Sequence, residues 1–273
     1  MKKLPVCQVL NCFKYPKDDF VKHICYGLDI HKQIGFDYAN ITLEGIETFP
    51  TDKEIETIVR YAEDAGIPIR LSHLPFSGTE EAMRKALDVT KLLHVDYTVM
   101  HPIAKGVDIA DYDEKACYEE NKPYLSAIVD YANKIGVNVT LENTRLGYRD
   151  GSVGRYCADI ESLTRQADEL GVGICWDTGH GHSSCLVQSE ALKALGSRVK
   201  MLHINDNYGM GDYHLAPFIG NIDWQDTMNG LSAIGFDGIF SYEVSTAHMT
   251  HEAAVAYGKY ILSTSQILME MMD

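Results

Sequence analysis

The sequence contains no long apolar run. No uninterrupted apolar stretch approaches the roughly 18 residues that a membrane-spanning helix needs. The short apolar run behind Met1–Pro5 is interrupted by Asn11, and no small-residue cleavage site follows it. We therefore expect a cytoplasmic protein that has no membrane partner.

Basic residues and paired cysteines are also scarce. Lysine and arginine number 24 against 39 aspartate and glutamate residues, and the formal net charge is −15. Nucleic-acid binding draws much of its affinity from basic surface, so no nucleic-acid partner is expected. The seven cysteines stand singly, without a CxxC pair. This spacing favours free thiols in a reducing compartment over disulfides or a thiolate zinc site.

Linkers and low-complexity tracts are missing as well, so one domain is expected over residues 1–273. Short β-rich runs alternate with longer segments of helical period. The predicted strands are Val6–Leu10, Tyr38–Leu43, Pro68–Ser72, Tyr97–Met100, Val137–Leu141, Val172–Trp176, Val199–Leu202 and Gly238–Tyr242. The predicted helices are Asp18–Ile34, Asp52–Ala65, Thr79–His94, Tyr112–Ile135, Asp159–Leu170, Leu186–Leu195, Trp224–Ile234 and Ala247–Met271.

Glycines mark the ends of several predicted helices. Five of them stand between a helix and the next strand, where a left-handed C-terminal residue is typical: Gly35, Gly66, Gly136, Gly171 and Gly235. This repeated β-α punctuation predicts an α/β protein, a single-domain (β/α)8 TIM barrel.

Seven predicted strands run into an acidic or imidazole side chain. The spacing between successive members allows one crossover helix with its loops. If the strands are parallel in one closed barrel, these side chains converge at a single mouth and favour a metal-dependent active site. They are Glu44, His73, His101, Glu142, Asp177, His203 and Glu243.

Two loops add further candidate ligands. Asp177 and His180 are three residues apart in a glycine-containing segment, so both can face one divalent ion. The alternative makes Asp177 a helix N-cap and His180 an ordinary loop residue, and His182 is a weaker substitute. In the long segment Asn205–Asp223, Asp212 and His214 can share one side of an extended chain, although loop capping is the alternative.

Glu142 and Glu243 are the strongest candidates for chemistry. A glutamate at the buried end of a strand is costly unless it is paired, bound to a metal or used with a shifted pKa. Aromatic walls for a ligand are also available from Trp176, Tyr148, Tyr208 and Trp224, although a core position is the commoner role of such residues.

The pattern resembles a known superfamily. The matching residues are Glu142, Asp177-Thr178-Gly179-His180, His203-Ile204-Asn205-Asp206, His214, Gly220-Asn221-Ile222-Asp223-Trp224 and Glu243, after strands five to eight. They resemble the xylose-isomerase-like TIM barrels, and within them the proteins described as sugar phosphate isomerases/epimerases. The resemblance covers nearly the whole chain.

Resemblance to the ketose 3-epimerase branch implies one metal ion held by Glu142, Asp177, His203 and Glu243. It also implies that the two glutamates act as acid and base. That branch usually carries a second glutamate six residues after the first, but this chain has Tyr148 there. Arg145 is a candidate contact for a sugar oxygen or a phosphate.

Resemblance to endonuclease IV, which has a three-zinc site, implies a larger ligand set. The nine matching residues are His73, His101, Glu142, Asp177, His180, His203, Asp212, His214 and Glu243. One octahedral ion accepts roughly six ligands. Either several ions bind, or His73, His101, His180 and His214 contact substrate instead.

The surrounding residues favour small-molecule chemistry over DNA cleavage. The loop after the fourth strand leads into Asp108, Asp111, Asp113 and Glu114, opposed only by Lys105, where a DNA enzyme needs basic groups. We predict an isomerase or epimerase for a sugar, sugar phosphate or related polyol, with roughly one to three Zn²⁺ or Mn²⁺ ions per chain. Assembly into a homo-oligomer is left open.

In the predicted mechanism, the metal chelates a carbonyl and the neighbouring hydroxyl of a carbohydrate and stabilises an enediolate. Glu142 and Glu243 stand on opposite faces of the substrate, where one removes a proton and the other returns it. A metal-promoted hydride shift is the alternative mechanism. The alternative functions are a multinuclear zinc phosphodiester hydrolase and a non-catalytic carbohydrate-binding barrel.

Overall fold

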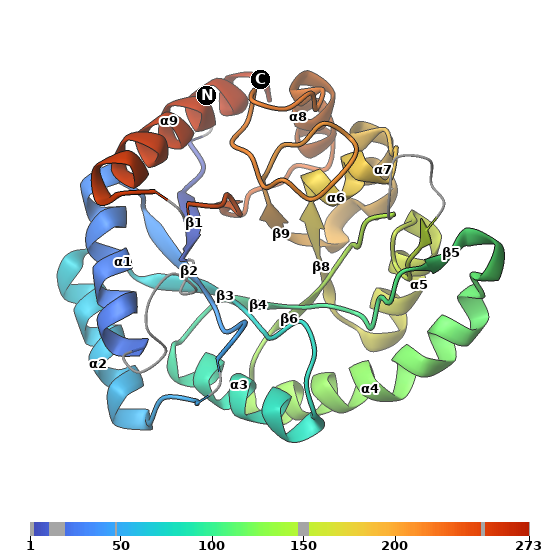
Figure 1. The fold of residues 1–273 in the computed structure, drawn as a ribbon, viewed down its shortest axis with the longest axis horizontal. Helices are drawn as coiled ribbons and strands as arrows, with labels where there is room; N and C mark the ends of the chain where they lie inside the picture. The colour runs from blue at the N-terminus through green and yellow to red at the C-terminus, as the bar shows by residue number, and fades with distance from the viewer. Residues whose placement is uncertain (1–2, 11–19, 47, 147–152, 247–248, 273) are drawn as a thin grey trace.

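The computed structural model describes residues 3–10, 20–46, 48–146, 153–246 and 249–272. Among them, no helix is both long enough and apolar enough to cross a membrane. Parallel strands form the central wall of the fold (Figure 1). These strands are β1 (Val6–Leu10), β2 (Tyr38–Thr42), β3 (Ile69–His73), β4 (Tyr97–Met100), β6 (Val139–Glu142), β8 (Gly173–Asp177), β9 (Val199–His203) and β10 (Phe240–Tyr242).

The strands close into a barrel. In the described part of the chain their order is β10, β1, β2, β3, β4, β6, β8 and β9. Between β9 and β10, the Ile204 amide donates to the Ser241 carbonyl at 2.8 Å, and the Glu243 amide donates to the Ile204 carbonyl at 3.1 Å. These bonds nearly close the sheet, so the predicted α/β single-domain TIM barrel is confirmed.

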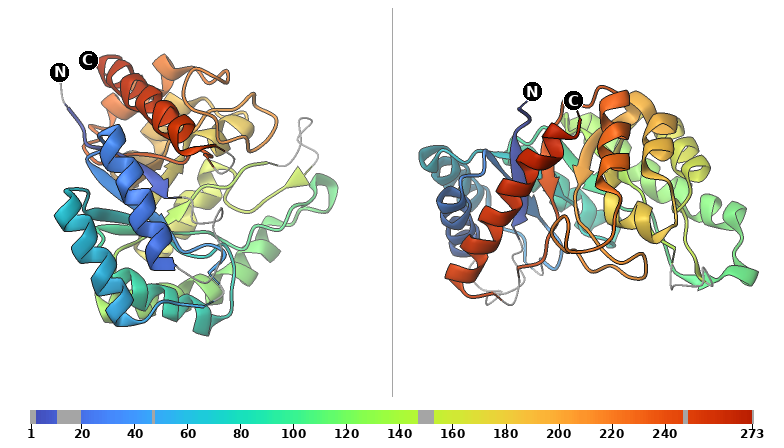
Figure 2. Two further views of the ribbon diagram at one scale, coloured as in Figure 1. Left: turned by 60° about the vertical axis from the view of Figure 1, so that its left-hand side comes forward. Right: turned by 90° about the horizontal axis from the view of Figure 1, so that it is seen from above.

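Helices cover the outside of the barrel (Figures 1 and 2). They are α1 (Phe20–Ile34), α2 (Asp52–Ala65), α3 (Glu80–Leu92), α4 (Glu114–Ile135), α5 (Ile160–Leu170), α7 (Gln188–Leu195), α8 (Trp224–Ala233) and α9 (His251–Glu270). The short helix α6 (Thr178–Ser183) instead follows directly on the carboxyl end of β8. Separate from the barrel, β5 (Val107–Asp108) pairs antiparallel with β7 (Val153–Gly154).

Glycine ends several of these helices as the sequence predicts. A left-handed residue lets the last carbonyls of a helix find partners, and glycine adopts it without a Cβ clash. The φ angles lie between 64° and 99° at Gly35, Gly66, Gly136, Gly171 and Gly235.

The apolar core has two parts. Inside the barrel, a small cluster contains Cys7, Leu71, Val99, Cys175 and Met201, all buried. A larger cluster fills the space between strands and helices. Burying one side chain such as Leu71 contributes about 1.5–3 kcal/mol. The six described cysteines are free thiols, as their single spacing predicts, and Cys12 lies outside the described residues.

The structure corrects the prediction for the segment after β8. We expect a glycine-loosened turn there from the sequence, but the segment forms helix α6. Asp177 is its N-cap, because its Oδ1 atom accepts a hydrogen bond from the His180 amide at 2.6 Å. The N-cap alternative for Asp177 is therefore confirmed, whereas His180 lies in a helix rather than in a loop.

Capping residues also move two helix starts. Asp113 caps α4, so that helix begins at Glu114 instead of Tyr112. Thr250 caps α9, which begins at His251, whereas the predicted start at residue 247 lies outside the described residues. The β5–β7 pair was not predicted, since strands of two residues carry no periodic signal.

The carboxyl ends of the barrel strands share one end of the molecule with the long connection 204–223. In the right-hand view of Figure 2, this orange connection lies at the end from which α9 begins. We call this end the mouth.

Candidate metal centre

The barrel strands bring predicted site residues to the mouth. His73, Glu142, Asp177 and His203 are the last residues of β3, β6, β8 and β9. Parallel strands end at the same edge, so side chains far apart in the sequence become neighbours there.

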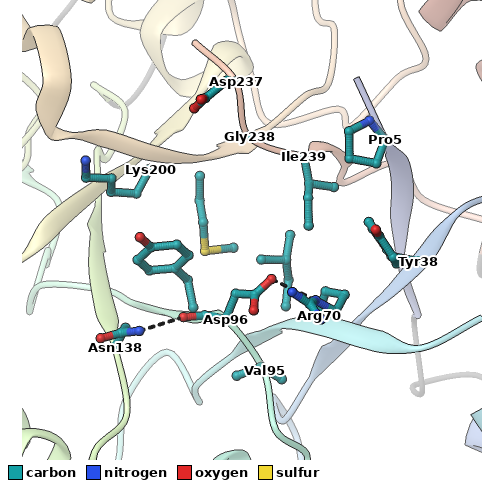
Figure 3. A pocket seen from close by; sticks show the side chains of 13 residues that line it. Pro5, Tyr38, Arg70, Val95, Asp96, Asn138, Lys200, Asp237, Gly238 and Ile239 are labelled. Atoms are coloured by element: carbon teal, nitrogen blue, oxygen red, sulfur yellow. Dashed lines mark hydrogen bonds and ion pairs between the residues drawn. The ribbon is translucent and has the colours of Figure 1, made fainter. Parts of the chain in front are cut away.

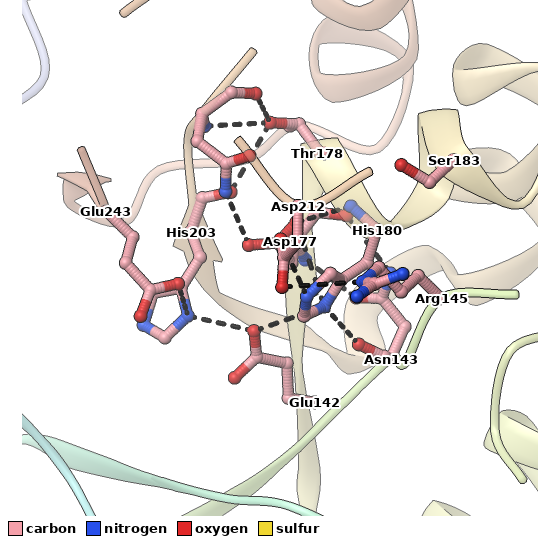
Figure 4. A network of polar contacts seen from close by, with 12 residues as sticks. Glu142, Asn143, Arg145, Asp177, Thr178, His180, Ser183, His203, Asp212 and Glu243 are labelled. Atoms are coloured by element: carbon pink, nitrogen blue, oxygen red, sulfur yellow. Dashed lines mark hydrogen bonds and ion pairs between the residues drawn. The ribbon is translucent and has the colours of Figure 1, made fainter. Parts of the chain in front are cut away.

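A central group consists of Glu142, Asp177, His203 and Glu243. Each offers one ligand atom, and these atoms lie within 4.8 Å of one another. His203 Nδ1 is 3.0 Å from Glu142 Oε1 and 3.3 Å from Glu243 Oε2 (Figure 4). Ligand atoms about 2.0–2.2 Å from one ion lie within about 4.4 Å of each other. The central group therefore needs only a small contraction to hold one divalent ion.

A second group shares Glu142 with the first. His73, His101 and Glu142 offer ligand atoms within the same 4.8 Å. The two Nε2 atoms are 3.0 Å apart, and His101 Nε2 is 3.0 Å from Glu142 Oε2. Glu142 thus lies between two sets of imidazoles.

Asp212 joins two further histidines of the predicted set. Its Oδ1 atom is 3.5 Å from His180 Nε2 and 3.1 Å from His214 Nε2. His180 also approaches the central group, with Nδ1 3.6 Å from Glu142 Oε1. All nine predicted ligands are thus connected at the mouth.

Backbone carbonyls orient three of the imidazoles. His73 Nδ1 lies 2.6 Å from the Leu74 carbonyl oxygen. His180 Nδ1 lies 2.8 Å from the Asn143 carbonyl oxygen, and His214 Nδ1 lies 2.8 Å from the Glu243 carbonyl oxygen. A carbonyl only accepts, so each Nδ1 donates its hydrogen and each Nε2 faces the site. This is the orientation in which a neutral imidazole binds a metal ion.

Burial and opposite charge compete at the site. Burial raises the pKa of Asp177 to about 6. Burial also disfavours the charged form of Glu243, but His203 and His214 outweigh it and hold its pKa at about 2. Burial disfavours charged His180 as well, yet Asp177 and Asp212 raise its pKa to about 10. Protonated imidazoles therefore balance the carboxylates, and a divalent ion is expected to displace those protons.

A buried carboxylate oxygen of the candidate ligands also supports a bound ion. Glu142 is fully buried, and its Oε2 atom accepts no hydrogen bond of acceptable geometry from the described residues, although His101 Nε2 lies 3.0 Å away. A buried polar atom left in this state is costly, and an ion is one of its ordinary explanations. Together with the packed ligand atoms, it supports a metal centre at the mouth.

Two asparagines that the sequence prediction missed support Asp177. The Asn143 side chain accepts from the Asp177 amide at 2.6 Å and donates to the Asp177 carbonyl at 3.0 Å. Asn205 Nδ2 donates to Asp177 Oδ2 at 2.7 Å. An asparagine after a strand has no distinctive pattern, so only its position next to a candidate ligand could have indicated this role.

Some predicted site residues have other roles. The Glu44 carboxylate accepts a hydrogen bond from the Phe76 amide and belongs to none of the ligand groups found in the described residues. Trp176 and Trp224 are buried in the core, so they are not walls of the mouth. Tyr208 is 46% exposed, and Tyr148 lies outside the described residues.

A cleft of about 440 Å³ opens beside the candidate metal centre, and both His101 and His180 line it. Arg145 lines it too, with Nε 3.4 Å from Asp212 Oδ2. Phe76 was missed by the sequence prediction; it is 50% exposed, and its ring centroid is 4.2 Å from that of His101. The cleft offers a small ligand direct access to the imidazoles.

A second cavity lies at the opposite end of the barrel (Figure 3). Its charged lining includes Arg70, whose Nε donates to Asp96 Oδ2 at 2.8 Å, and also Lys200 and Asp237. Its described lining residues include no imidazole and no thiol. The predicted ligands are thus concentrated at the mouth.

Fold and donor set together define a (β/α)8 barrel with a candidate metal centre at its mouth. The chain belongs to the xylose isomerase-like TIM barrel family, whose model matches residues 28–261. An inosose isomerase from Bacillus licheniformis is 24% identical over 234 residues, covering 80% of this chain and 82% of the relative. An uncharacterized protein of Methanocaldococcus jannaschii is 27% identical over 223 residues, covering 76% and 74% of the two chains.

Solved structures share the fold. An L-ribulose 3-epimerase superposes with a TM-score of 0.78 at 13% identity, covering 99% of this chain and 96% of its own. A D-tagatose 3-epimerase-like protein gives a TM-score of 0.75 at 22% identity, covering 99% and 100%. At these identities, the likeness establishes the architecture.

Proposed function

We propose that this protein is a divalent-metal-dependent isomerase or epimerase of a sugar, a sugar phosphate or a related polyol derivative. The observation that carries the proposal is the central group, in which His203 Nδ1 lies within 3.3 Å of both Glu142 and Glu243. The named functions of the relatives, an inosose isomerase and several ketose 3-epimerases, support the substrate class.

Glu142, Asp177, His203 and Glu243 would hold the ion, which is Zn²⁺ or Mn²⁺ in this proposal. A bound divalent ion supplies Lewis acidity that polarises a substrate carbonyl. Further ions would use His73, His101, His180, Asp212 and His214, and where no second ion binds, these imidazoles contact the substrate.

Glu142 and Glu243 are proposed to move the proton. Glu142 is the last residue of β6 and Glu243 directly follows β10, so they approach His203 from different sides of the strand order. One carboxylate removes the proton next to the substrate carbonyl, and the other returns a proton to the opposite face. Both carboxylates contact the His203 imidazole. The distance between the two carboxylates is therefore set by the protein before a substrate binds.

The test is solvent exchange. Protein loaded with Mn²⁺ or Zn²⁺ is incubated in D2O with L-ribulose, D-tagatose, D-fructose and an inosose, and deuterium at the carbon beside the carbonyl is followed by NMR. We expect incorporation with at least one ketose, and its loss after metal removal with EDTA. Product formation without deuterium would contradict proton transfer and favour a hydride shift.

A second candidate, a multinuclear zinc phosphodiester hydrolase, is favoured by one observation. Glu142 belongs both to the central group and to the group with His73 and His101, so adjacent ions would share it. Against this candidate, Asp108, Asp111 and Asp113 are exposed near the mouth.

Metal counting and DNA binding separate the two candidates. Elemental analysis that gives three zinc ions per chain, together with incision of abasic duplex DNA, would establish the hydrolase. The sugar enzyme should bind duplex DNA no better than about 10⁻⁴ to 10⁻⁶ M at physiological salt.

A further inference from the structure

The cleft beside the candidate metal centre has two unlike walls. Phe76, Pro102, Ile103 and Ala104 contribute apolar surface, and His101 and His180 connect this surface to the candidate ligands. A volume of about 440 Å³ is within the range of small-molecule sites. The cleft therefore has room for the part of a substrate that extends away from the reacting carbon.

The other wall is cationic. Lys105, Arg145 and Arg155 line the cleft, and Asp212 is the one carboxylate among the described lining residues. The chain as a whole carries a formal net charge of −15. Three cations gathered in one concave site of an acidic protein produce a local positive potential that favours an anionic ligand group.

The ion pairs of Lys105 and Arg145 can be exchanged for a ligand. Lys105 Nζ is 3.3 Å from Glu120 Oε1, but the two side chains are 76% and 50% exposed. Such an exposed pair is worth little and exchanges easily for a ligand. Arg145 contacts Asp212, which is already shared with two imidazoles. Arg155 donates from NH1 to the Arg145 carbonyl at 3.2 Å, which fixes the two arginines relative to each other.

We propose that this wall is an anion subsite that binds the terminal phosphate or carboxylate of the substrate, an inference that rests on the sugar isomerase or epimerase function proposed above. His180 belongs both to the cleft and to the surroundings of Glu142. A substrate whose carbonyl end reaches the central group therefore extends past His180 and places its anionic end against Lys105, Arg145 and Arg155. Guanidinium groups suit this role because they bind carboxylate and phosphate oxygens in pairs.

A single anionic group fits this subsite better than a nucleic-acid backbone. Asp108, Asp111 and Asp113 are exposed in the same β4–α4 connection that carries Lys105. A duplex needs positive charge along several successive phosphates. Here Lys105 of the cleft is followed along the chain by exposed carboxylates at Asp108, Asp111 and Asp113 rather than by further basic residues.

The experiment measures affinity rather than turnover. Metal-loaded protein is titrated calorimetrically with two matched pairs: D-ribulose with D-ribulose 5-phosphate, and D-fructose with D-fructuronate. In a separate arm, inorganic phosphate is titrated into EDTA-treated protein, which needs neither metal nor sugar. The variants are Lys105→Gln and Lys105→Gln combined with Arg155→Gln. Lys91→Gln is the matched control, because Lys91 is exposed in the last turn of α3.

We expect one anionic sugar to bind at least about tenfold tighter than its neutral partner, because the anionic group accepts charge-assisted hydrogen bonds that a neutral hydroxyl does not. The preferred pair identifies phosphate or carboxylate as the anion. This ratio should fall in Lys105→Gln and approach unity in the double variant, but it should not change in Lys91→Gln.

Equal affinities within both pairs would overturn the anion subsite. A preference for the anion that is undiminished in the double variant would also overturn it, because two of the three proposed cations would then contribute nothing to anion binding. In the phosphate arm, loss of binding in Lys105→Gln supports the subsite even if no ketose binds, so failure of the proposed sugar chemistry is separable from failure of the subsite.

Discussion

Replacing Glu142 by glutamine is expected to damage the centre more than the same change at Glu243. The Glu142 side chain is 1% exposed, whereas the Glu243 side chain is 19% exposed. Four imidazoles of the described residues have a nitrogen 3.0 to 3.6 Å from the Glu142 carboxylate: those of His73, His101, His180 and His203. Glu243 contacts only His203 and His214 in that part of the chain, at 3.3 and 3.7 Å.

The difference in burial between the two glutamates sets the loss of stability that we expect for each variant. Removing one partner of a buried ion pair costs about 3–5 kcal/mol, and glutamine keeps the shape and one acceptor oxygen, so we expect about 3 kcal/mol for Glu142→Gln in metal-free protein. For the partly exposed Glu243, a charged hydrogen bond is worth about 1.5 kcal/mol. A domain with a typical stability of about 5–15 kcal/mol remains folded in both cases.

Urea unfolding of EDTA-treated protein measures these values, and elemental analysis measures the metal that each variant retains. Exchange in D2O should slow by at least about 10²-fold in both variants, because each glutamate handles one proton transfer. Glu56→Gln, an exposed change on α2, is the charge-matched control. Equal destabilisation by Glu142→Gln and Glu243→Gln would refute the argument from burial. Undiminished exchange in either variant would show that its carboxylate is a ligand only.

Three further predictions concern the metal and the fold. Asp177→Ala should empty the central group while far-UV circular dichroism keeps the signal of the barrel and changes at most by loss of the 6-residue helix α6 that Asp177 caps; normal metal content would contradict its role as a ligand. Gly179→Ala should weaken metal binding by about 10–100-fold. The new Cβ atom would lie 1.9 Å from Asn205 Oδ1 and would displace the side chain that donates to Asp177. Unchanged affinity in a metal titration would contradict this prediction. Burial lowers the pKa of His31 to about 3 from 6.5, so the unfolded chain binds the extra proton and stability is lost as pH falls through that window. This contribution is about 1.4 kcal/mol per pH unit. Urea unfolding at pH 7 and pH 5 should therefore show that acidification costs the wild type more stability than it costs His31→Leu, and equal pH dependence in the two proteins would contradict the prediction.

Local signals predicted most of the fold. Gly66 and Gly136 occupy left-handed positions at helix ends because glycine alone has no Cβ to clash there, and this preference can be recognised in the sequence. Apolar runs between such stops predicted the strands to within a few residues. The parallel barrel follows from the repeated alternation, since parallel strands require crossover connections.

The same rule indicated that Glu142, Asp177 and His203 would meet. Each ends a barrel strand, and barrel topology leaves strand ends only one common edge. Their identity as ligands stays a prediction, because topology determines which residues are neighbours but not what they bind.

Other features were decided only by the tertiary structure. Helix α6 has poor intrinsic helix propensity, because two of its six residues are glycines. It forms where Asp177 caps its first turn. Its Gly181 packs against the Trp176 ring, which lies 2.5 Å from the position that a Cβ atom would take. Asn143 and Asn205 became supports of Asp177 through contacts across 34 and 28 residues. The sequence by itself therefore determined the barrel and the residues at its mouth, since periodicity and helix stops are local. The contacts that orient those residues depend on long-range packing, which leaves no local pattern.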